Sequence, residues 1–200
     1  MNFLAHFHLA WPDSGLVAGG LEGDYCKGPL GNNMPIAIKR GVKLHRSIDA
    51  YTDSHPLVIE LRREFPPALR RYAGILIDLG FDYCLTRRWS HYSTLALEEF
   101  NDAVLRLLLD QQDNLSTDCQ TMLARLIEHN ILGAYHDWQT VSIAAARIGE
   151  RFQRGNPLRD VDREMASLKC RLEYTFSNFY PQLLGFSNEQ KRHLELVHDR

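Results

Sequence analysis

Three residues with the chemistry of metal ligands recur every fourth position in one segment of the chain. They are His45, Asp49 and Asp53, within a segment whose spacing of apolar residues is helical. On an α-helix this spacing stacks the three side chains along one face. An imidazole and two carboxylates are costly to bury for packing alone, whereas a divalent cation binds nitrogen and oxygen donors on a rigid support. The segment therefore predicts a cation site.

The rise of the helix limits which of these residues can share one ion. His45 and Asp49 lie about 6 Å apart along the axis, so both can reach it. Asp53 lies about 12 Å from His45, which is too far for easy sharing. Asp53 is therefore a ligand of a second ion, a group that orients a ligand, or a contact for a polar helix end.

A second segment places acidic residues inside an apolar run. Asp78 and Asp82 lie four apart in the sequence ILIDLGFDY, so they share a helical face among core residues. A carboxylate in that setting needs a cation, an arginine or a set of N–H donors. Two helices that carry acids on inward faces predict a metal site between them, and the alternative is buried salt bridges or helix caps.

Other residues near these segments allow both a functional and a structural interpretation. Arg46 could reach a phosphate held at the metal, or pair with Asp49 or Asp78. Asp24 is either a ligand or a residue at a helix end. His6 and His8 face different ways on a helix, so at most one points inward, and a lone histidine among apolar residues is more often a core group.

Residues 27–88 hold eleven basic and six acidic residues. If the four aspartates surround cations, only Glu60 and Glu64 remain to offset the basic surface. The site is then rimmed by positive charge, which attracts an acidic or phosphorylated partner. An ordinary solvated surface is the alternative.

Composition limits the class of protein. The chain has 200 residues, 44% of them hydrophobic, and a formal net charge of -2, which fits one domain over residues 1–200 and gives no sign of nucleic-acid binding. Four scattered cysteines without a Cys-x-x-Cys pair indicate a reducing compartment. The first ten residues lack a basic leader, and no apolar run approaches about 18 residues. We expect a cytoplasmic protein that does not associate with membranes.

The spacing of apolar residues is helical nearly everywhere, and no alternating strand pattern with Asn-Gly or Asp-Gly turns occurs. The sequence therefore predicts an all-α fold, a single compact domain of seven to nine helices. Its expected helices are 2–10, about 14–25, 35–54, 56–65, 68–88, 94–112, 116–131, 137–153 and 160–184.

Four motifs in the first 92 residues resemble those of the acyl carrier protein phosphodiesterase family. They are Asn2-Phe3-Leu4-Ala5-His6, Gly23-Asp24-Tyr25-x-Lys27-Gly28, Gly41-x3-His45-Arg46-x-Ile48-Asp49-x3-Asp53 and Asp78-x3-Asp82-x6-Trp89. Tyr25 stands where the family pattern has phenylalanine. After residue 92 the likeness is limited to helical character and the end near Phe179-Tyr180-Pro181.

The resemblance implies a fold similar to a divergent HD-type phosphohydrolase and a divalent cation, most typically Mn²⁺, with Mg²⁺, Fe²⁺ or Co²⁺ possible. It also implies hydrolysis of the phosphodiester that joins 4′-phosphopantetheine to a serine of holo-acyl carrier protein.

The resemblance also assigns roles to individual residues. It implies metal ligands Asp24, His45, Asp49 and Asp78; catalytic roles for His6, Asp24, His45 and Asp49; and an outer shell or second metal at Asp53 and Asp82. Arg46 is also expected to have a catalytic role, because of its position on the helix beside His45. A protonated aspartate or His6 would supply the proton to the leaving serine. Because carrier proteins are acidic, we expect them to dock on Lys39, Arg40, Lys43, Arg62 and Arg63, and we expect Lys27 near the entrance for the phosphopantetheine group.

Two alternatives remain at this stage. One is an HD-type hydrolase of nucleotides or other small phosphoesters, and the other is a non-catalytic helical binding module. Neither His-Asp dipeptide, His136-Asp137 or His198-Asp199, is expected to form the site. The number of ions, the oligomeric state and the preferred carrier protein stay open.

Overall fold

Helices make up all the regular structure in the part of the chain that the structure describes. The computed structural model describes residues 1–31 and 33–196. Within those residues there are nine α-helices and no strand, which confirms the all-α prediction. The α-helices are α1 Phe3–Ala10, α2 Ser14–Glu22, α3 Ile36–Ser54, α4 Pro56–Glu64, α5 Ala73–Arg87, α6 Leu97–Asp110, α7 Thr117–Glu128, α8 Gln139–Gly149 and α9 Asp162–Leu196.

Five short 3₁₀-helices connect them. These are η1 Arg70–Tyr72, η2 Trp89–His91, η3 Gln112–Asn114, η4 Ile131–His136 and η5 Pro157–Arg159. The predicted helix over 68–88 is therefore a 3₁₀ turn followed by α5. The predicted helices 14–25 and 137–153 end earlier, at Glu22 and Gly149.

The last helix is longer than predicted. We expected an end near residue 184. Instead α9 continues through Pro181 to Leu196. Tertiary contacts hold the extra turns in place: Phe186 stacks on Tyr51 with ring centroids 4.3 Å apart, and Ser187 Oγ donates to the carbonyl of Leu9.

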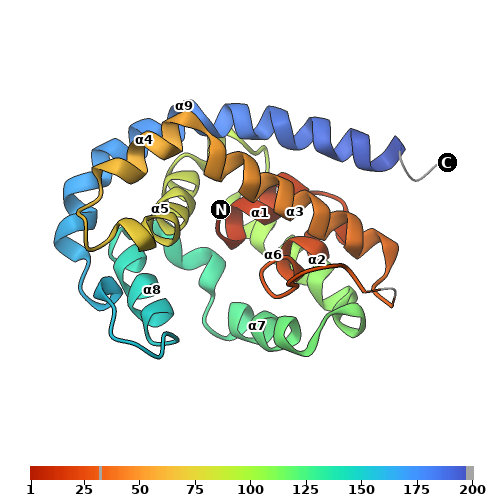
Figure 1. The fold of residues 1–200 in the computed structure, drawn as a ribbon. Helices are drawn as coiled ribbons and strands as arrows, with labels where there is room; N and C mark the ends of the chain where they lie inside the picture. Colours follow the sequence, from red (N-terminus) through yellow and green to blue (C-terminus); the bar gives the residue numbers. More distant parts are fainter. Residues whose placement is uncertain (32, 197–200) are drawn as a thin grey trace.

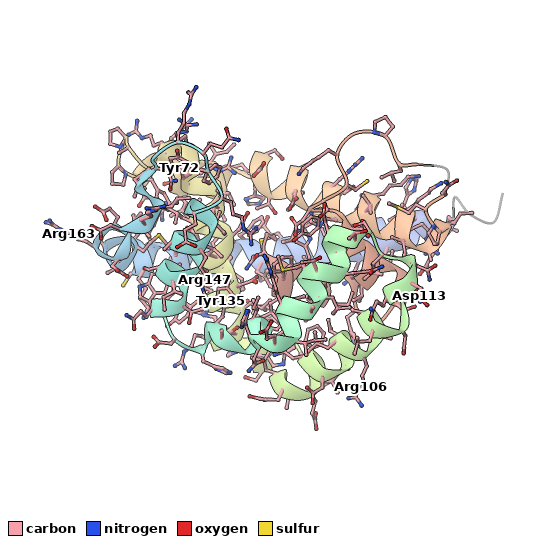
Figure 2. All side chains as sticks on the ribbon, turned by 90° about the horizontal axis from the view of Figure 1, so that it is seen from below. Tyr72, Arg106, Asp113, Tyr135, Arg147 and Arg163 are labelled. Atoms are coloured by element: carbon pink, nitrogen blue, oxygen red, sulfur yellow. The ribbon has the colours of Figure 1, made fainter. Side chains whose placement is uncertain are left out.

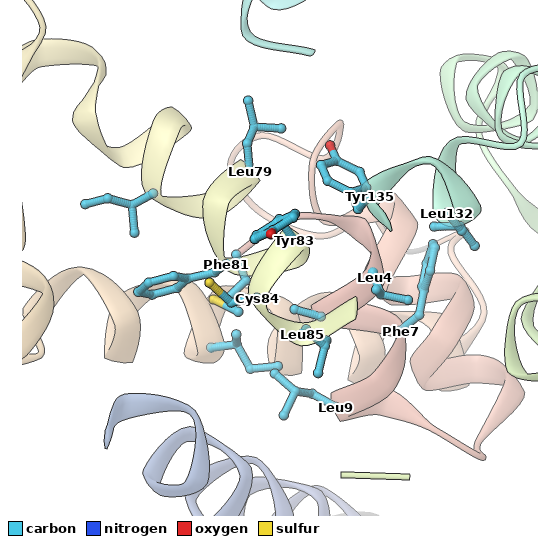
Figure 3. Close-up of a cluster of buried hydrophobic side chains, with 14 of the residues drawn as sticks. Leu4, Phe7, Leu9, Leu79, Phe81, Tyr83, Cys84, Leu85, Leu132 and Tyr135 are labelled. Carbon is cyan, nitrogen blue, oxygen red and sulfur yellow. The ribbon is translucent and has the colours of Figure 1, made fainter. Parts of the chain in front are cut away.

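The central helix is α5, which is apolar on nearly all sides and therefore buried (Figure 3). Figure 3 shows Leu79, Phe81 and Leu85 of this helix in the same buried cluster as Leu4 and Phe7 of α1. In Figure 1, α3, α4 and α9 lie along one side, α7 and α8 along the other, and the N-terminus lies in the middle beside α5. Residues from all of these helices join one hydrophobic core.

Helices α2 and α3 touch through their backbones. A Cβ added to Gly41 of α3 would lie 2.6 Å from the carbonyl oxygen of Gly15 and 2.7 Å from Cα of Gly19. A Cβ added to Gly15 of α2 would in turn lie 3.0 Å from the carbonyl carbon of Ala37. This close approach packs α3 against the end of α2. It thereby places His45 of α3 next to Gly23, the residue that follows α2.

The four cysteines, Cys26, Cys84, Cys119 and Cys170, are free, as expected. No helix among the described residues has the length and apolar character needed to cross a membrane. The likeness to HD-type folds and the single-domain organisation stay predictions.

Candidate functional site

His45 is held by backbone atoms of α2. Its Nδ1 donates to the carbonyl of Gly20 over 2.9 Å, and its ring lies on Gly23, which has no side chain to obstruct it. A neutral imidazole whose Nδ1 carries the proton presents a lone pair at Nε2. The Nε2 of the buried His45 therefore faces the centre of the site as an acceptor or a metal ligand.

His6 of α1 lies against His45. The two rings stack with centroids 3.9 Å apart and planes 13° apart. Burial lowers the pKa of His6 to about 3, with the neighbouring His45 adding to the effect. His6 Nδ1 is buried and has no hydrogen-bond partner among the described residues. His8 faces elsewhere, toward the hydroxyl of Tyr180, so only one of the two N-terminal histidines enters the site.

Asp49 joins the two imidazoles. Its Oδ1 lies 3.1 Å from His6 Nε2, and its Oδ2 lies 3.1 Å from His45 Nε2. Burial alone raises the pKa of Asp49, but the contacts with His45 and His6 outweigh it and hold that pKa well below its usual range. The carboxylate is therefore ionised across the physiological range.

These three side chains fit a divalent cation. One donor atom from each of His6, His45 and Asp49 lies within 4.8 Å of the other two. Because His45 Nδ1 already donates to Gly20, the lone pair at its Nε2 and the carboxylate of Asp49 repel each other unless a proton or a cation lies between them. Two nitrogens and an oxygen suit a transition metal better than Mg²⁺, which prefers oxygen donors.

Asp78 of α5 faces Asp49 across a positive charge. The α-ammonium of Met1 lies 3.2 Å from Asp49 Oδ1 and 3.1 Å from Asp78 Oδ1. Burial lowers the pKa of this ammonium, but the two carboxylates outweigh burial and raise it to about 11. The two aspartates therefore point toward a shared space that stabilises a cation, although Asp78 is outside the cluster of His6, His45 and Asp49.

Asp24 and Arg46 lie on the open side of the cluster. Asp24, in the turn after α2, places Oδ1 3.8 Å from His45 Nε2. Arg46 pairs with neither Asp49 nor Asp78, so that alternative was wrong. It donates instead to the carbonyls of Cys26 and Gly28, over 2.8 and 2.7 Å, and so holds the loop that carries Asp24 beside α3.

Asp53 and Asp82 have other partners. Asp53 forms an ion pair with Arg62 of α4 at 2.5 Å, and its side chain is 63% exposed. Asp82 is fully buried and accepts from the backbone N–H groups of Leu4 and Ala5. A buried carboxylate was expected to need a cation, an arginine or N–H donors, and Asp82 has the N–H donors. These bonds anchor the first turn of α1, the helix that carries His6.

Three hollows that share lining residues lie at or beside the cluster, and one of them contains His45 and Asp49. The site groove, about 300 Å³, is lined by Asp24, Lys27, His45, Arg46 and Asp49 among others. Arg46 also lines a basic groove of about 590 Å³ with Lys39, Arg40 and Lys43. Asp24 also lines an apolar pocket of about 370 Å³ between α5, α7, η4 and α8.

The residues predicted to bind the substrate or its carrier protein separate into two groups. Lys27, Lys39, Arg40 and Lys43 line these hollows, whereas Arg62 and Arg63 lie on α4 and line none of the three. Arg62 is neutralised by Asp53, and Arg171 of α9 pairs with Glu60 and Glu64. The two glutamates are thus engaged elsewhere and do not offset the basic groove.

Sequence reasoning missed several parts of the site. Gly20 and Gly23, which seat His45, and the wall of the apolar pocket were not identified. Gly23 was within reach, because it begins the motif that contains Asp24. The His136-Asp137 dipeptide lies outside the cluster, as expected, with His136 near Glu98 and Asp137 binding the N–H of Gln139. His198-Asp199 lies outside the described residues.

Comparison with known proteins places the chain in a family. The family model described as acyl carrier protein phosphodiesterase matches residues 1–183. The chain belongs to this family. It is 30% identical over 192 residues to an acyl carrier protein phosphodiesterase of Klebsiella pneumoniae, covering 96% of this chain and 100% of the relative.

A second relative, the acyl carrier protein phosphodiesterase of Escherichia coli O157:H7, is 31% identical over 190 residues, covering 92% of this chain and 96% of the relative. No solved structure matches the chain.

Proposed function

We propose that this protein is a metal-dependent phosphodiesterase that hydrolyses the bond between 4′-phosphopantetheine and a serine of holo-acyl carrier protein. The products are the apo-carrier protein and 4′-phosphopantetheine. The observation that carries the proposal is the cluster of His6, His45 and Asp49, open to a groove and set in a chain of this family.

The cation would be held by His6, His45 and Asp49, with Asp24 and Asp78 beside them. We propose Mn²⁺ as the natural ion, with Fe²⁺, Co²⁺ and Mg²⁺ as alternatives. A divalent cation there would polarise the phosphodiester and lower the pKa of a water molecule.

The protein's own groups perform the remaining tasks. Lys27 and Arg46 line the site groove and would offset the charge of the phosphodiester. Asp82 fixes the first turn of α1, and the carbonyl of Gly20 fixes the orientation of His45. The basic groove beside Arg46 provides a surface of suitable charge for an acidic carrier protein.

The test is to incubate the protein with holo-carrier protein and Mn²⁺, with and without a chelator, and to measure the mass of the carrier protein. A loss equal to 4′-phosphopantetheine that the chelator abolishes supports the proposal. Asp49→Asn should abolish this loss and keep the helical circular dichroism spectrum. The matched variant Asp53→Asn, one helical turn further along α3, should remain active, because Asp53 pairs with Arg62.

Other results would contradict the proposal. Hydrolysis of small phosphoesters without cleavage of the carrier protein would favour a small-molecule phosphohydrolase. Failure to bind any divalent metal, together with a large loss of stability in Asp49→Asn, would favour a structural role for the acids.

A further inference from the structure

The apolar pocket adjoins the site groove at a single turn of the chain. Asp24 lines both hollows, and Tyr25, the next residue, lines the apolar pocket. Asn2 and Phe3, at the start of the helix that carries His6, line the pocket on another side. A molecule bound at the cluster can therefore extend into this pocket without crossing the protein surface far from the site.

The chemistry of the pocket wall suits an uncharged, flexible chain. Its aliphatic side chains include those of Leu79, Met122, Ile131 and Ile148. Two of its polar lining residues are neutral and paired with each other, because the Asn2 amide donates to the hydroxyl of Tyr135 over 2.9 Å. Pockets of about 300–1,000 Å³ with apolar walls and a few polar groups are typical sites for small organic ligands, and this pocket measures about 370 Å³.

The mouth of the pocket carries positive charge. The exposed side chains of Arg147 and Arg151 line it, and Figure 2 shows Arg147 close to Tyr135 on the face of the molecule seen from below. Lys27 adds a further positive charge in the adjoining site groove. The positive charge of the site groove favours an anionic group at the cluster, and the aliphatic wall favours a neutral remainder in the pocket.

The order of the three hollows matches the order of groups in the proposed substrate. The basic groove meets the site groove at Arg46, and the site groove meets the apolar pocket at Asp24. A carrier protein on the basic groove, its phosphodiester at the cluster and its prosthetic arm in the apolar pocket would follow the same sequence. A folded protein segment does not fit a pocket of this size, whereas a single flexible arm does.

We propose that the apolar pocket between α5, α7, η4 and α8 binds the pantetheine arm of the substrate. This inference rests on the proposed function and adds the location of a binding site. The dimethyl group and methylene carbons of the arm contact the aliphatic wall, and its two amides lie near Asn2, Tyr135 and Thr140. The pocket thus determines which group on the phosphate is accepted.

Two exposed isoleucines provide a matched test. Ile143 of α8 lines the pocket and is 46% exposed, whereas Ile127 of α7 is 44% exposed and does not line it. Both tolerate a polar side chain, because both already face water. Calorimetric titration with pantetheine, which has no phosphate, should show binding that Ile143→Glu weakens by about tenfold or more and Ile127→Glu leaves unchanged.

A second pair of variants tests the pocket by filling it with a bulky side chain instead of adding a charge to its wall. Ala144→Phe places a ring in the pocket, while Ala146→Phe, on the same helix, changes a residue that does not line it. Ala144→Phe should weaken pantetheine binding and raise the KM for holo-carrier protein, whereas Ala146→Phe should change neither. Equal effects of both members of each pair, or no binding of pantetheine to the unaltered protein, would overturn the inference.

The pantetheine titration also separates this inference from the proposed function. Pantetheine holds no phosphodiester, so its binding is measured whether or not the carrier protein is cleaved. If pantetheine binding depended on Ile143 and Ala144 but the carrier protein were not cleaved, the proposed pantetheine site would stand and the proposed reaction would be wrong. If the Ile143 and Ala144 variants cleaved the carrier protein as well as the unaltered protein does, the proposed reaction would stand and the proposed pantetheine site would be wrong.

Discussion

The imidazole of His45 rests directly on the backbone of Gly23. A Cβ at Gly23 would lie 2.6 Å from His45 Nδ1 and closer still to Cγ. The same nitrogen donates to the carbonyl of Gly20, so two residues of the α2 end fix both the position and the tautomer of the ring. The site depends on the absence of a side chain as much as on the presence of donors.

Gly23→Ala should therefore impair the site with little loss of helix. The added methyl group displaces the ring of His45 and breaks its bond to Gly20, so Mn²⁺ affinity should fall by about tenfold or more. Overpacking of this kind also costs about 1–3 kcal/mol of stability. The measurements are the Mn²⁺-induced shift in melting temperature and the circular dichroism spectrum.

Gly20→Ala is the matched control for that change. A Cβ there would meet Phe7 and His6 only at 3.8 Å or more, which is an ordinary contact. Its Mn²⁺ response should equal that of the unaltered protein. If Gly23→Ala bound Mn²⁺ as well as Gly20→Ala does, the proposed role of Gly23 in positioning His45 would be wrong.

The contact between α2 and α3 leads to a separate prediction about stability. Gly41→Ala should destabilise the fold by about 1–3 kcal/mol or more, because every atom within 2.7 Å of the added Cβ belongs to the backbone of α2 and no rotamer change relieves the clash. Gly185→Ala in α9, where nothing lies within 4 Å, should instead stabilise the protein by up to about 1 kcal/mol. Urea denaturation compares the two, and equal effects would refute the prediction.

The sequence was sufficient for the elements and for part of the site. Apolar spacing identified nine helices because most of them bury a single face, and the four-residue spacing of His45 and Asp49 placed both at one centre. It failed where the partner lies on another helix. Nothing local in the sequence indicates that Asp82 binds the backbone of Leu4 and Ala5, or that Asp53 binds Arg62.

The end of α9 illustrates the same limit. Proline has a low propensity for helix interiors, yet α9 contains Pro181. The contacts of Phe186 with Tyr51 and of Ser187 with Leu9 stabilise the helix beyond it. Those partners lie more than a hundred residues away in the chain, so a local pattern contains no information about them. The packing of α3 on α2 was also missed, because it depends on how the backbones of Gly19 and Gly41 meet.

Asp82 predicts how stability depends on pH. Burial raises its pKa to about 7, against the opposing effect of the N–H groups of Leu4 and Ala5. Its ordinary value is 3.8, so between these two pH values the folded chain holds a proton that the unfolded chain has lost. The contribution of Asp82 to the free energy of unfolding therefore falls as pH rises through this window, by about 1.4 kcal/mol per pH unit and about 4 kcal/mol in all.

Asp82→Asn removes this titration. Its free energy of unfolding, measured by urea denaturation from pH 5 to 8, should lack the fall that the unaltered protein shows, and the two curves should become parallel above about pH 7. Curves that run parallel over the whole range would show that Asp82 titrates normally in the folded chain. Lower stability of the variant at every pH would not affect the comparison, because only the difference in slope is tested.

The basic groove leads to a prediction about ionic strength. Lys43 is exposed and lines this groove, close to Arg46 at the edge of the site. Lys43→Glu should lower kcat/KM for holo-carrier protein by about tenfold at low salt and leave kcat nearly unchanged, because it reverses a charge that attracts an acidic partner. The difference should shrink toward physiological and higher salt as the charges are screened.

Arg106→Glu on α6 is the control for this charge reversal. Arg106 is exposed, lies outside all three hollows and projects from the periphery of the view in Figure 2. It changes the net charge by the same amount, so any effect of total charge appears in both variants. Rates measured from 25 to about 300 mM salt should separate the two only at the low end. Equal losses in both variants would mean that the carrier protein responds to the overall charge of the enzyme, and the basic groove would then lose its role as the docking surface.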